Sequence, residues 1–173
     1  METQRWEEFR ELRAEVHVEK KEDALRTAKE WPEASQADTI WTDGSRLEDK
    51  RVGAAVAFKD ENGWRQDGMY LGKNKEVFDA EVFAIGQALQ VLDRRGEENR
   101  SYTIFSDSQA VLSRTQHDRT GPGQALAIKD ITTSRAIISR GCTIHLRWTP
   151  SHTGIEGNER ADQAAREAAE ERG

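Results

Sequence analysis

The chain has 173 residues, of which 35% are hydrophobic and 34% are charged, and its formal net charge is −6. This length predicts one domain with room for an appended segment, and no apolar run approaches the roughly 20 residues that span a bilayer. The amino terminus opens with charged residues and not with an apolar signal segment, so we expect an intracellular protein without a membrane anchor. The acidic balance excludes a surface that is basic throughout but leaves room for a local phosphate-binding patch.

The first 37 residues predict a helical amino-terminal arm or connection segment, followed by a main domain over residues 38–173. Within residues 2–31, apolar side chains recur at helical spacing at Trp6, Phe9, Leu12 and Val16. Pro32 ends this helical pattern.

Three strands joined by short turns are expected next, over residues 39–42, 52–58 and 64–72. In the second strand, larger apolar residues alternate with Gly53, Ala55 and Ala57, as in a half-buried strand. Asn62-Gly63 is a common hairpin turn signal, so the three strands predict an antiparallel meander.

The hydrophobic period then changes to steps of three and four, which predicts an amphipathic helix over residues 79–95. A strand at 102–106, helices at 108–116 and 124–140, a strand at 143–148 and a closing helix at 157–171 follow. Strands connected through helices are expected to be parallel neighbours. The chain therefore predicts an α/β fold with a five-stranded mixed sheet, three antiparallel strands and then parallel strands, flanked by helices.

Four carboxylates occupy positions that suggest one shared site. Asp43 and Asp107 each follow a predicted strand, and ligands of such sheets bind beyond the carboxyl ends of the strands. Glu81 lies in the first turn of a predicted helix at the edge of its apolar stripe, and Asp162 adjoins the alanine stripe of the closing helix. Each acid alone is compatible with an ordinary cap or turn residue that suits a helix dipole.

A cluster of four carboxylates favours bound cations for physical reasons. Two carboxylates about 5 Å apart repel by roughly 3 kcal/mol at an effective dielectric of about 20. Oxygen ligands suit Mg²⁺ or Mn²⁺ better than zinc. Two such ions can activate a water molecule and stabilise a leaving oxygen in phosphoryl transfer.

Four segments in this order resemble type 1 ribonuclease H, and especially the ribonuclease H domains of non-LTR retrotransposon reverse transcriptases. They are residues 42–45 (TDGS), 79–81 (DAE), 106–109 (SDSQ) and 148–162 (WTPSHTGIEGNERAD). The resemblance covers roughly residues 38–170 and implies a ribonuclease H-like fold. It also implies an endonuclease that hydrolyses the RNA strand of RNA–DNA hybrids with two Mg²⁺ ions, for which Mn²⁺ can substitute.

The resemblance implies a role for each matched acid. Asp43 would bridge both metal ions, while Glu81 and Asp107 would hold the ion beside the leaving group. Asp162 would help to hold the ion that carries the attacking water. His152, on a mobile loop, would assist proton transfer or product release.

Substrate contacts implied by the resemblance involve the 2′-hydroxyls of the RNA strand, at Gly44, Ser45 and Gln109. Glu159 also matches a position near the metal ions. Two departures stand out: the residues before the helical Glu lack the asparagines of many members, and residues 115–124 lack a basic helix. The isolated domain is therefore expected to bind hybrid weakly and to rely on an attached reverse transcriptase domain. We also expect the isolated domain to be a monomer.

Other functions remain open from the sequence. A nuclease of the same fold that acts on DNA is one, and a non-catalytic spacer or partner-binding module is another. No glycine-flanked nucleophile accompanies Ser151 and His152, which argues against a serine triad. The remaining histidines, His17, His117 and His145, lack a comparable context and receive no predicted role.

Overall fold

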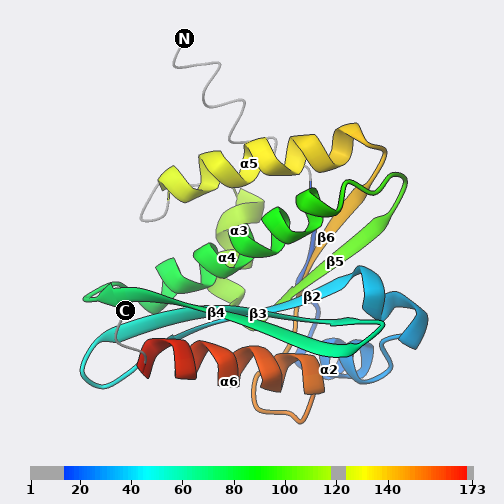
Figure 1. Ribbon diagram of the computed structural model, residues 1–173. Coiled ribbons are helices and arrows are strands. Elements are labelled where there is room, and N and C mark those ends of the chain that lie inside the picture. Colours follow the sequence, from blue (N-terminus) through cyan, green and yellow to red (C-terminus); the bar gives the residue numbers. More distant parts are fainter. Residues whose placement is uncertain (1–13, 118–123, 171–173) are drawn as a thin grey trace.

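The computed structural model describes residues 14–117 and 124–170, which form a single mixed sheet covered by helices (Figure 1). The sheet has six strands in the order β1-β6-β5-β2-β3-β4. The strands are β1 (Ala14–His17), β2 (Thr39–Arg46), β3 (Arg51–Asp60), β4 (Gly63–Lys73), β5 (Ser101–Ser106) and β6 (Thr143–Trp148). The helices are α2 (Lys21–Lys29), α3 (Val77–Arg95), α4 (Gln109–His117), α5 (Gln124–Ser139) and α6 (Glu156–Glu170), with a 3-10 helix at Glu33–Asp38.

The predicted mixed α/β architecture is confirmed. Strands β2, β3 and β4 form the expected antiparallel meander, and β2, β5 and β6 pair in parallel. All five predicted strands and all four predicted helices of the main domain are present, with ends that shift by a few residues. In the described part of the chain, no helix combines the length and the apolar character needed to cross a membrane.

The sixth strand corrects the prediction of a continuous amino-terminal helix. Residues Ala14–His17 form β1, which pairs in parallel with β6, and Val16 lies opposite Leu146. Ala14 and Val16 pack against the main core, which is the period of two typical of a strand. The helical pattern resumes only in α2, whereas Trp6, Phe9 and Leu12 lie outside the described residues.

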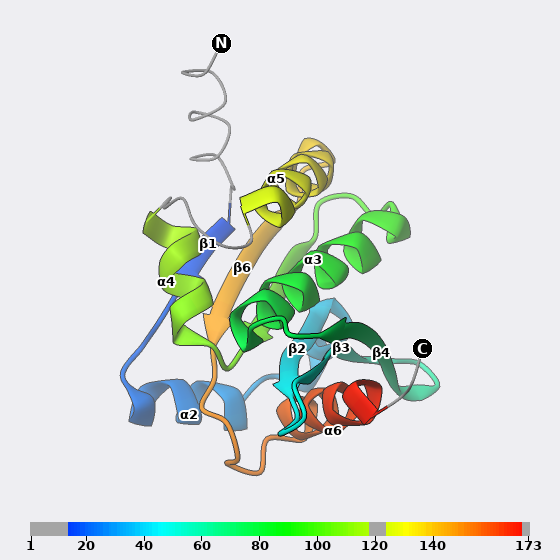
Figure 2. The same cartoon turned by 90° about the vertical axis from the view of Figure 1, so that its left-hand side faces the viewer.

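Helices cover both faces of the sheet. In Figures 1 and 2, α3, α4 and α5 lie on one face, whereas α2 and α6 lie on the other. The first face holds the larger core, where Ile40, Ile104 and Ile144 of the strands pack with Leu89 and Leu92 of α3. In Figure 2, the arrowheads of β2 and β6 point towards the same edge of the sheet, where the loop that leads into α6 also lies.

Small residues bring α6 unusually close to the antiparallel strands. A Cβ atom added to Gly53 of β3 would lie 2.4 Å from the carbonyl oxygen of Ala165, so only glycine fits there. The alanine stripe of α6 faces this strand, and Ala165 is fully buried beside Ala55. This close packing fixes the position of Asp162, which lies on the same helix.

Candidate active site

Asp43 lies within β2, at the point where β2 no longer pairs with β5 but still pairs with β3. The parallel pairing of β2 with β5 ends at Thr42 opposite Ser106, whereas the antiparallel pairing with β3 continues to Arg46. The prediction that Asp43 ends its strand is therefore wrong, because β3 supports β2 for three residues more. The end of the parallel pairing is nevertheless at this point, and the Thr42 hydroxyl donates a 2.8 Å hydrogen bond across it to the Phe105 carbonyl.

The orientation of Asp43 follows from its strand partner. Asp43 lies opposite Ala55, and residues that face each other across two antiparallel strands project to the same side of the sheet. Ala55 packs against Ala164 and Ala165 of α6. Asp43 therefore faces α6, while Asp107 enters from the end of β5, directly after Ser106.

Glu81 reaches the site because α3 begins very close to β2. The helix starts with a capping box, in which the Asp79 carboxylate accepts a hydrogen bond from the Glu76 amide. A Cβ atom on Gly44 would lie 2.7 Å from the Ala80 Cβ and 2.8 Å from the Glu81 amide nitrogen. The absence of a side chain at Gly44 thus allows the contact, and the Gly44 amide lies close enough to the Glu81 carboxylate to oppose the rise in the pKa of that carboxyl.

Three carboxylates converge at this point and are called the acidic cluster below: Asp43, Glu81 and Asp107 offer oxygen atoms that all lie within 4.8 Å of one another. Asp43 and Glu81 are each only 3% exposed. Burial, followed by the charges of Glu81 and Asp107, raises the pKa of Asp43. Burial and Asp107 likewise raise the pKa of Glu81, and burial raises that of Asp107.

These properties fit a site for divalent cations. The donor set consists of oxygen atoms only, which suits Mg²⁺ and Mn²⁺. The Glu81 Oε2 atom is buried and has no hydrogen-bond partner among the described residues. Buried polar atoms normally have partners, and mutual repulsion of the three charges would be relieved by a cation.

Asp162 is the fourth carboxylate at the site and is held by α6. It lies close enough to Asp43 to form a side-chain contact that raises the pKa of Asp43. Its side chain is 17% exposed, and its Oδ2 atom forms a 3.0 Å ion pair with Arg166 Nη2, one helical turn away. The structure therefore brings Asp162 to the cluster but leaves it partly engaged with Arg166.

Asn158 is a site residue that the sequence reasoning missed. It lies in the first turn of α6, is 2% exposed and lies beside Asp107, where its amide lowers the pKa of that carboxyl. Its Nδ2 atom has no direct hydrogen-bond partner in the described part of the chain, so the contact with Asp107 is close but not a completed hydrogen bond. The only signal in the sequence was an asparagine between Gly157 and Glu159, and a polar residue near the start of a helix is ordinary.

His152 lies on the loop between β6 and α6, is exposed and adopts a φ of 56°. It is close enough to Asp107 to lower the pKa of that carboxyl, so the loop brings the imidazole towards the acidic cluster. The Glu159 carboxylate accepts a 3.3 Å hydrogen bond from the Gly154 amide and thereby supports this loop. Within the described residues, the Glu159 carboxylate thus contacts the loop and is not one of the three carboxylates of the acidic cluster.

The residues predicted to contact substrate border the acidic cluster. Gly44 and Ser45 continue β2 directly beyond Asp43. Gln109 is exposed and is the first residue of α4, two positions after Asp107. These positions place main-chain and side-chain polar groups on either side of the carboxylates.

Solved structures share this architecture. RNase H1 from the archaeon Halobacterium salinarum matches with a TM-score of 0.57 and 20% identity, over 76% of this chain and 96% of that chain. The N-terminal RNase H domain of a Mycobacterium tuberculosis protein gives a TM-score of 0.60 at 16% identity, over 76% and 97% of the two chains. LC11-RNase H1, solved in complex with an RNA/DNA hybrid, gives 0.59 at 22% identity, over 76% and 96%. The fold is therefore that of the ribonuclease H class of α/β proteins.

The sequence comparison defines the family. The family model described as RNase H matches residues 35–170, which is most of the chain. A protein named Ribonuclease H from Chromobacterium violaceum is 29% identical over 148 residues, which cover 75% of this chain and 98% of the relative. The chain belongs to the RNase H family.

Proposed function

We propose that this chain is an endonuclease that hydrolyses the RNA strand of RNA–DNA hybrids by using two divalent metal ions. The observation that carries the proposal is the buried convergence of Asp43, Glu81 and Asp107, with oxygen atoms within 4.8 Å of one another. Membership of the RNase H family supports the reaction, and a structural neighbour was solved with an RNA/DNA hybrid.

Asp43 has the central position among the proposed ligands. It contacts Glu81 and Asp162 and feels the charge of Asp107, so it faces all three other carboxylates. We therefore infer that Asp43 is shared by both ions, with Glu81 and Asp107 holding one and Asp162 holding the other. Mg²⁺ or Mn²⁺ bound there would supply an activated water and neutralise charge on the leaving oxygen.

Two neighbouring residues are proposed to assist without binding the ions. Asn158 lies against Asp107 and orients that carboxylate from a buried position. His152 is exposed on a loop near Asp107, which suits a group that moves a proton at the edge of the site. The nearby positions Gly44, Ser45 and Gln109 are proposed to contact 2′-hydroxyls, the groups that distinguish RNA from DNA.

The substrate is tested with labelled duplexes of one sequence: RNA–DNA hybrid, RNA–RNA and DNA–DNA, together with single-stranded RNA. With Mg²⁺ or Mn²⁺ at low salt, the expected result is cleavage of the RNA strand of the hybrid alone, with 5′-phosphate ends. Cleavage of the DNA duplex would instead favour a DNA nuclease of the same fold. Intact hybrid with both metals at high protein concentration would contradict catalysis and favour a spacer or partner-binding module.

We further propose that the chain acts as part of a retroelement reverse transcriptase inside the cell. The motif resemblance supports this context, as does the short connection between His117 and Gln124, which leaves little sequence for a basic hybrid-binding helix. The isolated chain is then expected to be a monomer with weak, strongly salt-dependent affinity for hybrid. Tight hybrid binding at physiological salt, measured by fluorescence anisotropy, would contradict the need for an attached domain.

A further inference from the structure

Three side chains that the proposed nuclease site does not use meet on the other side of the sheet from the larger core. They are called the histidine cluster: Glu15 and His17 of β1, and His145 of β6. In the parallel pairing of these strands, Glu15 lies opposite His145 and His17 lies opposite Arg147. Because side chains alternate along a strand, Glu15, His17 and His145 project from one face, although His17 and His145 are 128 residues apart in the sequence.

The potential ligand atoms of the histidine cluster form a small triangle. His17 Nε2 lies 3.1 Å from His145 Nδ1. Glu15 Oε2 lies 3.2 Å from His145 Nδ1 and 3.8 Å from His17 Nε2. Metal–ligand bonds of about 2.0–2.1 Å at tetrahedral angles place neighbouring ligand atoms about 3.3 Å apart, so this triangle has the dimensions of three corners of a tetrahedral site.

We propose that Glu15, His17 and His145 bind a first-row transition-metal ion of the Zn²⁺ type, which fastens β1 to β6. Two imidazoles and one carboxylate are a donor set suited to Zn²⁺ and its neighbours, whereas Mg²⁺ prefers oxygen atoms only. Three protein ligands leave a fourth position for water. The strand β1 has four residues and lies at the edge of the sheet, so a metal bridge to β6 would add a cross-link to a short edge strand.

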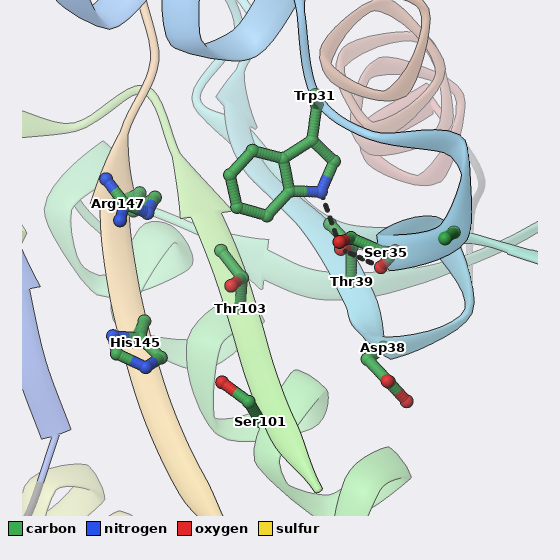
Figure 3. Close-up of a pocket in the computed structure, with 9 residues that line it drawn as sticks. Trp31, Ser35, Asp38, Thr39, Ser101, Thr103, His145 and Arg147 are labelled. Atoms are coloured by element: carbon green, nitrogen blue, oxygen red, sulfur yellow. Dashed lines mark hydrogen bonds between the residues drawn. The ribbon is translucent and has the colours of Figure 1, made fainter.

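The histidine cluster is accessible to solvent, and the nearby positive charge of Arg147 is paired with a carboxylate. His145 lines a pocket of about 290 Å³ together with Arg147, Thr103 and Ser101, as Figure 3 shows, so solvent reaches this imidazole. Arg147 lies two positions after His145 in the sequence, 3.5 Å from the Glu19 carboxylate and over the Trp31 ring.

The histidine cluster is separate from the acidic cluster. Asp43 lies on β2, and β5 and β6 stand between that strand and β1 in the sheet. With neighbouring strands about 4.8 Å apart, a metal ion between β1 and β6 would be more than two strand spacings from β2. The two clusters can therefore be removed independently by substitution.

Cobalt and zinc test the proposal directly. The full chain is titrated with Co²⁺ in excess Mg²⁺, and the intense visible absorption of four-coordinate Co²⁺ is followed. Zn²⁺ affinity is then measured by competition with a coloured chelator. The expected result is one tetrahedral Co²⁺ per chain, displaced by Zn²⁺, and retained in Asp43→Asn, which removes a proposed ligand of the nuclease site only.

Substitution of the ligands decides between a metal site and a hydrogen-bonded histidine pair. Loss of a group that merely orients a ligand costs about 10–100-fold in affinity, so His17→Gln and His145→Gln should each weaken Zn²⁺ binding at least about tenfold and abolish the Co²⁺ absorption. Glu19→Gln, a matched control, removes a nearby charge but no ligand and should retain the absorption. Circular dichroism in chelator verifies that each variant is folded. Absence of tetrahedral Co²⁺ in the wild type, or equal Zn²⁺ affinity in His17→Gln, would overturn the proposal.

Discussion

The acidic cluster and the histidine cluster lie on one sheet but differ in how deeply their side chains are buried and in whether those side chains repel one another. Asp43 and Glu81 are almost fully buried, and burial together with neighbouring charges raises the pKa of both. His17 and His145, in contrast, are partly exposed and satisfy each other through a 3.1 Å hydrogen bond. The acidic cluster is therefore strained without cations, whereas the histidine cluster is stable without an ion.

The acidic cluster lowers the stability of the metal-free fold, whereas the histidine cluster does not. Two carboxylates about 5 Å apart repel by roughly 3 kcal/mol at an effective dielectric of about 20. A hydrogen bond between neutral groups contributes about 1 kcal/mol to stability. The fold tolerates the larger opposing energy at the acidic cluster, which is the pattern expected of an active site.

The largest expected effect is that of Glu81→Gln on hydrolysis. Loss of a metal ligand that contributes several kcal/mol to the transition state corresponds to a rate decrease of roughly 10³-fold. In chelator the same variant should melt at a higher temperature than the wild type, because one of the repelling charges is gone. Cleavage assays and thermal melts measure the two effects.

The matched control for Glu81→Gln is Glu156→Gln, which removes an exposed glutamate that pairs with Arg160 on α6. It should leave both the rate and the metal-free melting temperature nearly unchanged. A Glu81→Gln rate within tenfold of the wild type would show that Glu81 is not a metal ligand.

Gly44→Ala should have the next largest effect, because it separates α3 from β2. The added Cβ would lie 2.7 Å from the Ala80 Cβ, and overpacking of this kind costs about 1–3 kcal/mol. A shift of Glu81 by about 1 Å is expected to reduce the rate by roughly 10²-fold. Denaturant unfolding and hybrid cleavage measure the two losses, and Ser45→Ala is the stability control. Full stability of Gly44→Ala would contradict the close contact.

Most of the fold was accessible from the sequence, because its elements have strong local signals. The meander was predicted from alternation and from the Asn62-Gly63 turn, and α3 from its apolar period. The strand β1 was not predicted, because Val16 fits a helical stripe as well as a strand. Only the hydrogen-bonding edge of β6, which is more than a hundred residues away, makes the extended conformation the favourable one.

The two clusters likewise differ in how far the sequence alone predicts them. The convergence of Asp43 and Asp107 was predictable, because each is near the carboxyl end of the parallel pairing. His17 and His145 gave no local signal, since the pairing of β1 with β6 alone brings them together. Asn158 was hidden because a polar residue in the first turn of a helix is ordinary, and its 2% exposure is a property of the packed fold.

The pH dependence of stability sharpens the contrast between the clusters. Burial and Asp107 raise the pKa of Glu81 from 4.5 to about 8 in the folded protein. Because the folded pKa lies above the unfolded one, the stabilisation is fully present below about pH 4.5 and is lost as the pH rises towards about 8. In chelator, the melting temperature should therefore fall between about pH 5 and pH 8 by more in the wild type than in Asp43→Asn.

The expected difference between these two proteins is at least about 2 °C, which corresponds to roughly 1 kcal/mol for a domain of this size. Saturating Mg²⁺ should reduce the slope in the wild type, because the bound cation favours the ionised carboxylates. Parallel pH profiles of the wild type and Asp43→Asn in chelator would contradict a strained acidic cluster.

The smallest expected effect is that of Thr42→Val, which retains the shape of the side chain. It removes the buried 2.8 Å hydrogen bond from the Thr42 hydroxyl to the Phe105 carbonyl, where β2 and β5 cease to pair. The expected cost is about 1 kcal/mol, measured by denaturant unfolding. An unchanged midpoint would indicate that β3 and α6 alone hold the strand in place.

Cleavage of the RNA strand of a hybrid by Asp43→Asn, beside the wild type and Asp49→Asn, tests the central claim most directly. Asp49 is a surface carboxylate that pairs with Arg51 at the turn after β2, so its substitution is a matched loss of charge outside the site. With saturating Mg²⁺, the wild type and Asp49→Asn should cut the RNA strand at similar rates, and Asp43→Asn should be slower by roughly 10³-fold. Wild-type cleavage by Asp43→Asn would contradict catalysis by the acidic cluster.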